Sequence, residues 1–139
     1  MPITTGYKKL LAEAEGRIQT IDVDEAKALL GRDDVVFVDL RDVRELDHAG
    51  MIPGAVHAPR GMLEFWVDPD SPYHRDVFAS GKRFVFYCAA GWRSALATDT
   101  VARMGLEPVC HIDGGFGAWV EAGGTVVPRP VRKPDAAKS

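Results

Sequence analysis

Three short runs of β-branched and aromatic residues constrain the fold of this chain more than any other feature. They are VVFVDL at 35–40, RFVFY at 83–87 and EPVCHI at 107–112. Each is nearly continuous in apolar side chains instead of alternating, which is typical of strands buried on both faces of a parallel sheet. Helical patterns lie between the runs and supply the crossovers that parallel strands need. The sequence therefore predicts an α/β fold with a central, mostly parallel sheet and helices on both faces.

The helices have recognisable beginnings and ends. Asp22 can cap a helix in which Glu25 completes a capping box, a polar helical stretch fills 42–49, and a helix over 94–104 closes at Gly105. Residues 1–18 carry an amphipathic pattern, which predicts an N-terminal helix packed on the body of the protein. We expect this helical extension at 1–18, one domain at 19–128, and a disordered, basic, Pro-rich tail at 129–139.

Composition narrows the partners and the compartment. The net charge of −3 argues against a nucleic acid or a membrane surface as partner. No apolar run reaches the roughly 18 residues of a membrane span, and the N-terminus lacks an apolar signal core. Two cysteines are too few for a disulfide framework. Together these features predict a cytoplasmic protein in a reducing environment.

Cys88 directly follows the RFVFY run and so lies at the carboxyl end of a predicted strand. In open α/β sheets, ligand sites form beyond these carboxyl ends. The next residues must turn sharply into a helix beginning near Ser94, and Gly91 can take the left-handed conformation that such a turn needs. Backbone amides of the turn, the start of the helix and the charge of Arg93 all favour a thiolate over a thiol. The residues thus point to a nucleophilic cysteine with an anionic or sulfur-bearing substrate, and the alternative is an inert buried thiol.

Beyond these local features, the chain resembles the rhodanese (sulfurtransferase) family over about residues 20–125. The resemblance rests on segments in the same order and spacing, together with the capped helix that precedes them. The segments are DVVFVDLRD, ELDHAGMIPGAVHAPRG, CAAGWRS with its helix, and MGLEPVCHIDGGFGAWVEAGG.

The resemblance implies a single rhodanese-like domain and a reaction. Cys88 would attack the outer sulfur of a small donor, such as thiosulfate or a persulfide, and carry it as a persulfide to cyanide or a thiol. A protein acceptor is an alternative. No metal or organic cofactor is implied. The persulfide would be cradled by the backbone amides of the active-site loop, formed by Ala89, Ala90, Gly91, Trp92, Arg93 and Ser94.

The length of this loop separates relatives that use the same scaffold. Four residues lie between Cys88 and Arg93, as in sulfur-transferring members, whereas the related cysteine phosphatases have one more. A phosphatase or arsenate reductase is therefore the less favoured alternative, and a non-catalytic sulfur carrier or interaction module is another. Two positions depart from the family pattern. Ala89 replaces an often basic residue, which weakens the case for thiosulfate as natural donor, and Met51 replaces the usual histidine, which concerns packing.

Several acidic, basic and hydroxyl side chains are candidates for supporting roles. Asp39, at the end of the first long run, is expected near the loop, where it would hold the loop backbone, pair with Arg93 or remain a solvated acid. Arg41 and Glu45 are predicted to form a structural ion pair. For Ser94, serving the start of the helix is favoured over donating a hydrogen bond to Cys88.

Aromatic residues and the remaining motifs carry weaker hypotheses. Trp92 would form a pocket wall together with aromatic residues of the 60–78 insertion, or these side chains simply pack in the core. Cys110 is predicted to be a core residue instead of a resolving thiol. The four histidines show no spacing suited to a metal, and GGFGAW lacks the spacing of a dinucleotide-binding loop. The insertion residues proposed for the pocket wall are Phe65, Trp66 and Tyr73.

Overall fold

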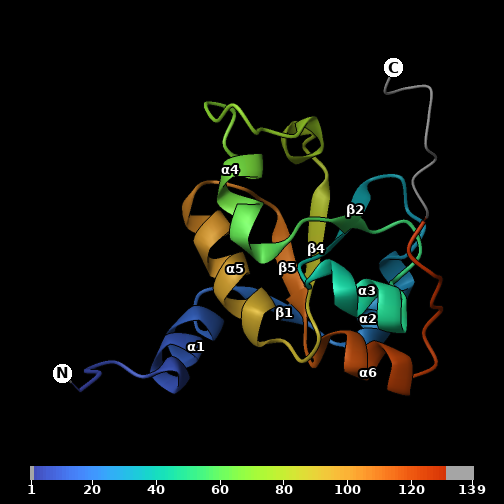
Figure 1. The fold of residues 1–139 in the computed structure, drawn as a ribbon, viewed down its shortest axis with the longest axis horizontal. Helices are drawn as coiled ribbons and strands as arrows, with labels where there is room; N and C mark the ends of the chain where they lie inside the picture. The colour runs from blue at the N-terminus through green and yellow to red at the C-terminus, as the bar shows by residue number, and fades with distance from the viewer. Residues whose placement is uncertain (1, 131–139) are drawn as a thin grey trace.

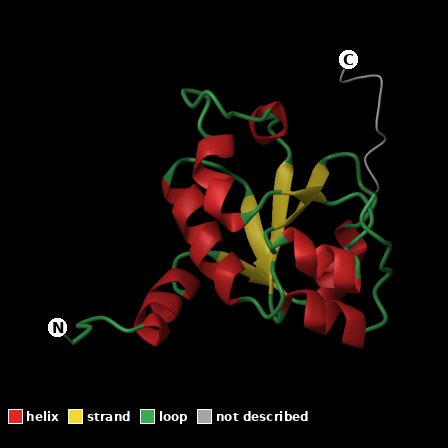
Figure 2. Ribbon diagram, in the orientation of Figure 1, coloured by secondary structure: helices red, strands yellow, loops and turns green. Residues whose placement is uncertain are grey.

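The computed structural model describes residues 2–130, which form a five-stranded parallel sheet with helices on both faces (Figure 1, Figure 2). The strand order is β1-β5-β4-β2-β3, and all neighbouring strands are parallel. The fold class predicted from the three buried runs is confirmed. The elements are, in chain order, α1 (Tyr7–Glu15), β1 (Gln19–Ile21), α2 (Val23–Leu29), β2 (Val35–Asp39), α3 (Val43–Ala49), β3 (Val56–His57), η1 (Arg60–Met62), α4 (Leu63–Val67), η2 (Asp76–Ala79), β4 (Arg83–Tyr87), α5 (Trp92–Arg103), β5 (Val109–Ile112) and α6 (Gly115–Glu121).

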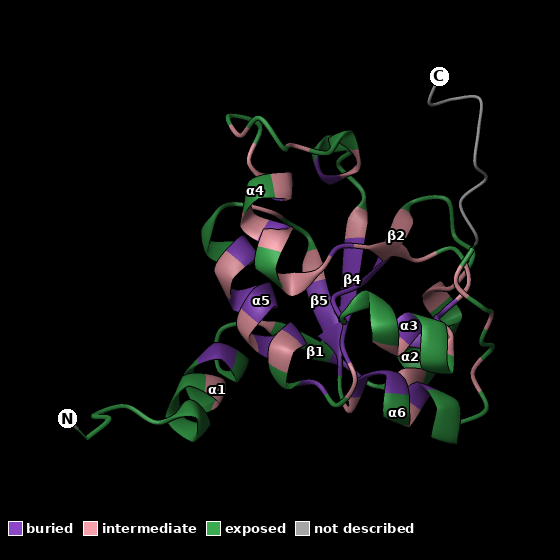
Figure 3. Ribbon diagram, in the orientation of Figure 1, coloured by how far each residue is buried: buried purple, intermediate pink, exposed green. Residues whose placement is uncertain are grey.

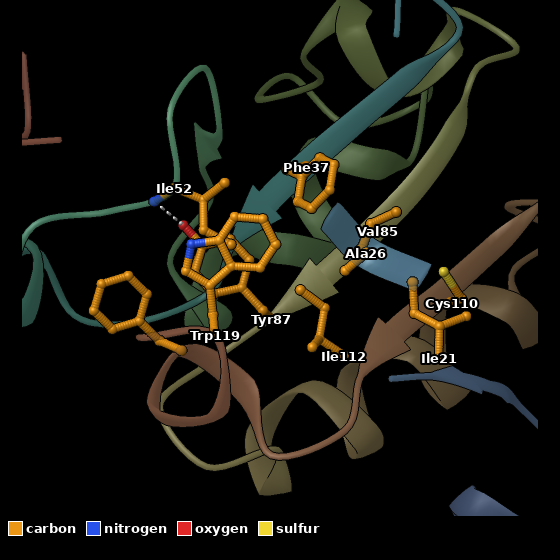
Figure 4. Packing of buried hydrophobic residues seen from close by; sticks show 10 residues of the cluster. Ile21, Ala26, Phe37, Ile52, Val85, Tyr87, Cys110, Ile112 and Trp119 are labelled. Carbon is orange, nitrogen blue, oxygen red and sulfur yellow. Dashed lines mark hydrogen bonds between the residues drawn. The ribbon is translucent and has the colours of Figure 1, made fainter. Parts of the chain in front are cut away.

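Each face of the sheet carries its own apolar cluster, as expected for strands whose side chains alternate between two covered faces. On one face, Ala26 of α2 and Trp119 of α6 pack on strand residues that include Phe37 and Ile112 (Figure 4). On the other face, α4, α5 and η2 pack on the alternate strand residues. Figure 3 shows the buried residues concentrated along the sheet and on the helix surfaces that face it.

The three strands predicted from the apolar runs match β2, β4 and β5 to within two residues at each end, but strand β1 was not predicted. Strand β1 pairs with β5, so that Thr20 lies beside His111 in the register. It spans only Gln19–Ile21, and the side chain of Ile21 alone is buried. A run this short and polar gives no periodic signal, because its strand conformation depends on pairing with β5.

The N-terminal segment forms a helix that packs on α5, as predicted (Figure 1). Ala14 is its buried contact residue. After α1, the guanidinium of Arg17 donates two hydrogen bonds to the carboxylate of Asp99 in α5, at 2.9 and 2.7 Å. The capping box of Asp22 and Glu25 is also present, at the start of α2.

The segment after α6 returns along the protein and joins the residues before β3. Met51 and Val127 exchange two backbone hydrogen bonds of 2.8 and 2.9 Å, and Met51 is buried. Met51, in the position where the family usually has histidine, therefore serves packing. Arg129, the first residue of the predicted tail, donates to Asp47, whereas residues 131–139 of that tail lie outside the described residues. No helix in the described part of the chain is long and apolar enough to cross a membrane.

A buried ion pair joins the end of β2 to the residues that follow it. The guanidinium of Arg41 donates to both carboxylate oxygens of Asp39, at 3.0 and 2.7 Å, and to the carbonyl of Gly50 at 2.8 Å. It also lies over the ring of Phe116, 4.1 Å from the centroid. Burial acts to lower the pKa of Arg41, but the hydrogen bonds and charge of Asp39 outweigh it and raise that pKa above its ordinary value.

This pair corrects two of the predictions. Asp39 is fully buried, so it is not a solvated acid, and its partner is Arg41 instead of Arg93. The predicted pair of Arg41 and Glu45 is wrong as well. The two-residue spacing at the carboxyl end of β2 lets Arg41 fold back on Asp39, and a buried carboxylate needs such a partner in the core.

Replacing Asp39 by Asn tests the energetic importance of this pair. The substitution preserves shape but leaves the guanidinium of Arg41 buried without its counter-charge, so we expect the free energy of unfolding to fall by about 3 kcal/mol. Urea denaturation followed by circular dichroism measures the change. Asp42→Asn is the matched control, because Asp42 is exposed, its partner Arg44 is exposed, and Asn caps helices as well as Asp. Equal losses in the two variants would contradict this account.

Candidate active site

Cys88 lies immediately after β4, at the carboxyl edge of the sheet and beneath the loop that leads into α5. The residue is 1% exposed, and its thiol forms no disulfide. Leu40 after β2 donates to the carbonyl of Tyr87 at 2.9 Å, so the two central strands still lie side by side where the cysteine emerges. The fold thus places this sulfur on a rigid base and not on a free loop.

The loop turns at Gly91, as predicted. Gly91 has φ = 102°, a left-handed conformation that L side chains rarely adopt, and it ends the loop as the residue before α5. The helix begins at Trp92, two residues earlier than the sequence suggested. With no side chain capping this helix, its first amides are free for another acceptor. The amides of Gly91 and Ser94 donate to Sγ of Cys88, at 3.2 and 3.4 Å.

A second backbone segment supports the loop from behind. The amide of Phe116 donates to the carbonyl of Cys88 at 2.8 Å, and the amide of Gly117 donates to the carbonyl of Ala89 at 3.0 Å. These bonds turn the loop carbonyls away from the sulfur, toward the start of α6. A Cβ atom at Gly115 would lie 2.5 Å from the Cys88 carbonyl oxygen. The GGFGAW motif is therefore the support of the cysteine loop.

Arg93 does not point free into the loop. Its guanidinium donates to both carboxylate oxygens of Glu45 in α3, at 2.8 and 3.0 Å. The hydrogen bond to Glu45 is the main cause that raises the pKa of Arg93, with Cys88 among the lesser causes. In the same way, Arg93 lowers the pKa of Glu45. The cation predicted for the loop is present, but a carboxylate partly neutralises it.

Ser94 contacts both the start of the helix and the cysteine, because its Oγ donates to the carbonyl of Gly91 at 3.4 Å and also lies near Sγ. Gly91 precedes the helix, so Ser94 already lies inside its first turn, fully buried. Its Oγ is 3.6 Å from Sγ of Cys88 and 2.9 Å from Nδ1 of His111 in β5. Nε2 of His111 is 3.1 Å from Oγ1 of Thr20. Sequence reasoning missed His111 and Thr20, although period-two alternation in β5 places His111 on the face opposite Cys110.

The predicted aromatic pocket wall is wrong in its partners. The ring of Trp92 lies against that of Tyr7 in α1, with 5.1 Å between the centroids. Tyr7, Trp92 and Arg93 contribute to a hollow of about 280 Å³ beside the cysteine loop. Figure 1 places α4 of the insertion along the other half of α5, where Val67 lines a hollow with Met104.

The insertion residues therefore have other surroundings. Trp66 packs on the second apolar cluster and carries the guanidinium of Arg75 over its ring, at 4.1 Å. Phe65 and Tyr73 are exposed. The amphipathic pattern of 1–18 was the available signal for Tyr7, but sequence alone did not indicate which end of α5 it would meet.

Cys110 is a core residue, as predicted. It is fully buried within the cluster between β4, β5 and α2, and burial raises the pKa of its thiol. Residues 2–130 contain no group of three or more His, Cys, Asp or Glu side chains arranged to hold a metal ion. Cys88, by contrast, has two backbone amides directed at its sulfur.

A parallel α/β sheet with a cysteine in an amide-lined loop at its carboxyl edge defines a class of cysteine-dependent domains that includes sulfurtransferases and phosphatases. Within that class, residues 22–122 match the model of the Rhodanese-like domain. The chain belongs to the rhodanese-like domain family.

Curated relatives agree with this assignment. The thiosulfate sulfurtransferase/rhodanese-like domain-containing protein 3 of Mus musculus is 33% identical over 101 residues, which cover 69% of this chain and 64% of the mouse protein. A thiosulfate sulfurtransferase of Pseudoalteromonas translucida is 29% identical over 102 residues, which cover 73% of this chain and 89% of the relative. The chain thus spans just under two thirds of the mouse relative.

A solved structure from Rhodopseudomonas palustris is more similar still. It is 53% identical, has a TM-score of 0.89, and covers 91% of this chain and 98% of its own. It is described as a protein of unknown function and a possible tyrosine phosphatase. The relatives therefore carry names from both branches of the class that the site defines.

Substituting Gly115 by Ala tests whether the segment before α6 shapes the cysteine loop. The new Cβ would meet the carbonyls of Cys88 and Ala89, so we expect the free energy of unfolding to fall by more than about 2 kcal/mol. This total exceeds the roughly 1–2 kcal/mol that a left-handed alanine costs by itself. We also expect alkylation of Cys88 by iodoacetamide to require higher pH, because the displaced amides no longer favour the thiolate.

Gly123→Ala is the control for this test, since Gly123 has φ = 77° but no atom near the position of its Cβ. It should show the backbone cost alone, with an unchanged pH profile of alkylation. An identical profile for Gly115→Ala would contradict the proposed support of the loop.

Proposed function

We propose that this chain is a sulfurtransferase that carries a sulfane sulfur as a persulfide on Cys88. The observation that carries the proposal is the pair of amides, from Gly91 and Ser94, that donate to Sγ of Cys88. Donors fixed in this way favour a thiolate before the reaction and a negatively charged terminal sulfur after it. The family and the sulfurtransferase names among its relatives support the same chemistry.

The reaction balances without a cofactor. The Cys88 thiolate attacks the outer sulfur of the donor and forms a new S–S bond. The remainder of the donor leaves with the electron pair of its broken bond to that sulfur. The acceptor nucleophile, a thiol or cyanide, then attacks the terminal sulfur, and the electron pair of the S–S bond returns to Cys88. Each half-reaction is a displacement at sulfur, which gives ping-pong kinetics.

The surroundings of Cys88 favour a particular kind of substrate. Ala89 brings no charge, and Arg93 is bound to Glu45, so the loop offers less positive potential than one with two free cations. This favours a persulfide over the dianion thiosulfate as donor. The hollow beside Tyr7 and Trp92 favours an acceptor with an apolar or aromatic body. Two free cysteines support a reducing compartment, which we propose is the cytoplasm.

Steady-state kinetics test the proposal. We expect sulfur transfer from an organic persulfide to a thiol, and from thiosulfate to cyanide, with parallel double-reciprocal plots. Cys88→Ser should abolish both reactions, whereas Cys110→Ser should retain them, since Cys110 is a core residue on the face of the sheet opposite Ser94 and His111. Absence of turnover with every donor and acceptor, in a folded protein, would contradict an enzymatic role and leave a sulfur carrier.

A phosphatase or arsenate reductase is the second candidate, and the description of the Rhodopseudomonas relative favours it. Against it stand the four-residue gap between Cys88 and Arg93 and the use of both terminal guanidinium nitrogens of Arg93 by Glu45. A phosphatase needs that guanidinium for the phosphoryl oxygens. Turnover of an aryl phosphate that is lost in Cys88→Ser would establish this function in place of sulfur transfer.

Releasing Arg93 from Glu45 should improve the use of anionic donors. In Glu45→Gln the loop gains net positive charge, so we expect the KM for thiosulfate to fall by about fivefold, which corresponds to roughly 1 kcal/mol. Because Arg93 lowers the pKa of Glu45, this carboxylate stays charged at pH values below the ordinary pKa range of Glu. The KM values of the wild type and of Glu45→Gln should therefore become equal only at still lower pH.

The control for this substitution is Glu64→Gln, which removes an ion-paired carboxylate on α4 from Arg60 and leaves the loop untouched. It should leave the KM for thiosulfate unchanged. A KM that stays the same or rises in Glu45→Gln would show that the ion pair does not limit anion binding.

A further inference from the structure

A continuous chain of hydrogen-bonding side chains leads from the sulfur of Cys88 out of the active site. Oγ of Ser94 lies 3.6 Å from Sγ, Nδ1 of His111 lies 2.9 Å from that Oγ, and Oγ1 of Thr20 lies 3.1 Å from Nε2 of His111. Three elements contribute to it. Ser94 belongs to α5 and His111 to β5, and Thr20 is the register partner of His111 in β1.

The chain connects the protein interior to its surface. Cys88 and His111 are each 1% exposed and Ser94 is fully buried, whereas Thr20 is exposed. Water therefore has little direct access to the sulfur but reaches the far end of the chain. A buried imidazole with hydrogen-bonding partners on both ring nitrogens, aligned between a nucleophile and solvent, is more than a packing requirement, because an apolar residue would fill the same volume without needing partners.

The protonation state of His111 suits a relay. Burial lowers the pKa of His111, and the nearby charge of Asp113 only partly opposes this, so the imidazole is neutral at pH 7. A neutral imidazole carries one N–H and exists in two tautomers. With the proton on Nε2, His111 donates to Thr20 and accepts from Ser94. With the proton on Nδ1, it donates to Ser94 and accepts from Thr20.

We propose that Ser94, His111 and Thr20 form a proton relay that carries the thiol proton of Cys88 to solvent, with His111 as its positioning residue. The inference rests on Cys88 being the nucleophile of the proposed function. The Cys88 proton passes to Oγ of Ser94, the Ser94 proton to Nδ1, the Nε2 proton to Oγ1 of Thr20, and the Thr20 proton to water. Each relay group ends with as many protons as it began with, the sulfur loses one, and water gains one.

After the transfer, the hydrogen bonds of the chain point in the opposite direction, and this stabilises the thiolate. His111 now donates through Nδ1 to Ser94, and the Ser94 hydroxyl can then donate to the sulfur or to the carbonyl of Gly91, which lies 3.4 Å from Oγ. A thiol acceptor leaves a proton for this relay to remove. When R–SH takes the terminal sulfur of the persulfide as R–S–S⁻, its proton stays behind on Cys88, and the relay removes it before the next donor arrives.

Other charged groups around His111 are engaged elsewhere. On α5, Asp99 binds Arg17 and Arg103, and Arg93 binds Glu45. Strand β1 contributes no titratable side chain, and on β4 the phenol of Tyr87 is bonded to Ile52 on the opposite face (Figure 4). Asp113, which follows β5, is the charged residue that acts on the pKa of His111, and Arg83 lies at the far end of β4. The relay therefore depends on the hydrogen bonds of His111 and not on a neighbouring ion pair.

His111→Asn and Thr20→Val interrupt the relay at two points. Asn retains a hydrogen-bonding group near the position of Nδ1 but cannot exchange tautomers, and Val replaces an exposed hydroxyl by a methyl group of the same size. We expect the pH of half-maximal alkylation of Cys88, measured by site-resolved mass spectrometry with iodoacetamide, to rise by about one unit in each variant, which is a tenfold loss of thiolate at low pH.

Solvent isotope effects provide a readout that a merely structural role would not move. For transfer to a thiol acceptor, we expect a curved proton inventory in the wild type, that is, a rate that falls non-linearly with the fraction of D2O in the solvent. The curvature arises because several protons move together. In both variants the inventory should become linear and the rate lower. Thr100→Val is the matched control, since its hydroxyl binds the carbonyl of Leu96 within α5, away from the relay. It should behave as wild type.

The outcomes separate the relay from the proposed function. Alkylation reports without any sulfur transfer how far the hydrogen-bonded chain stabilises the thiolate, so a shifted profile in a protein that forms no persulfide would retain the link of Ser94, His111 and Thr20 to the sulfur and refute the sulfurtransferase. Unchanged alkylation profiles in both folded variants, with an unchanged inventory, would overturn the relay. If His111→Asn fails to fold, Thr20→Val at the exposed end of the chain decides alone.

Discussion

The backbone of Gly115–Gly117 lies directly against the backbone of Cys88 and Ala89, and the chemistry at the sulfur depends on this contact. Two amides at the start of α6 bind the two loop carbonyls, which leaves the amides of Gly91 and Ser94 to face the sulfur. The close approach requires a residue without a Cβ at Gly115. A loop of the same sequence without this support would have no reason to keep its amides on one side.

The charged groups beneath and beside the loop divide into two separate pairs. The buried pair of Asp39 and Arg41 joins the end of β2 to Gly50, and so belongs to the framework. The half-exposed pair of Glu45 and Arg93 lies at the loop itself, where it reduces the positive potential offered to a donor. Because the two pairs are separate, the buried one can stabilise the edge of the sheet while the half-exposed one sets the affinity of the loop for anions.

The sequence was sufficient for the three central strands, for the presence of the helices between them and for the position of Cys88, because each depends on local patterns. The continuous apolar runs are themselves the buried strands, the capping box at Asp22 begins α2, and Gly91 takes its left-handed turn. The family resemblance added the order of the segments and directed attention to GGFGAW.

Side-chain partners were the part that sequence reasoning could not supply. Arg41 was assigned to Glu45 and Trp92 to the 60–78 insertion, but the fold gives them Asp39 and Tyr7. Strand β1 and the position of Thr20 beside His111 depend on pairing across the sheet, for which a three-residue strand carries no periodic signal. Such contacts join residues far apart in the chain, and their choice is made by the packed structure and not by local pattern.

The central claim is that Cys88 carries sulfur, and intact-protein mass spectrometry tests it most directly. After incubation with an organic persulfide or thiosulfate and removal of the small molecules, the account predicts that the wild-type protein gains the mass of one sulfur atom. The added mass should map to Cys88, vanish on addition of cyanide or a thiol, and be absent from Cys88→Ser. A wild-type mass that stays unchanged with both donors, in a protein whose Cys88 still reacts with iodoacetamide, would contradict the account.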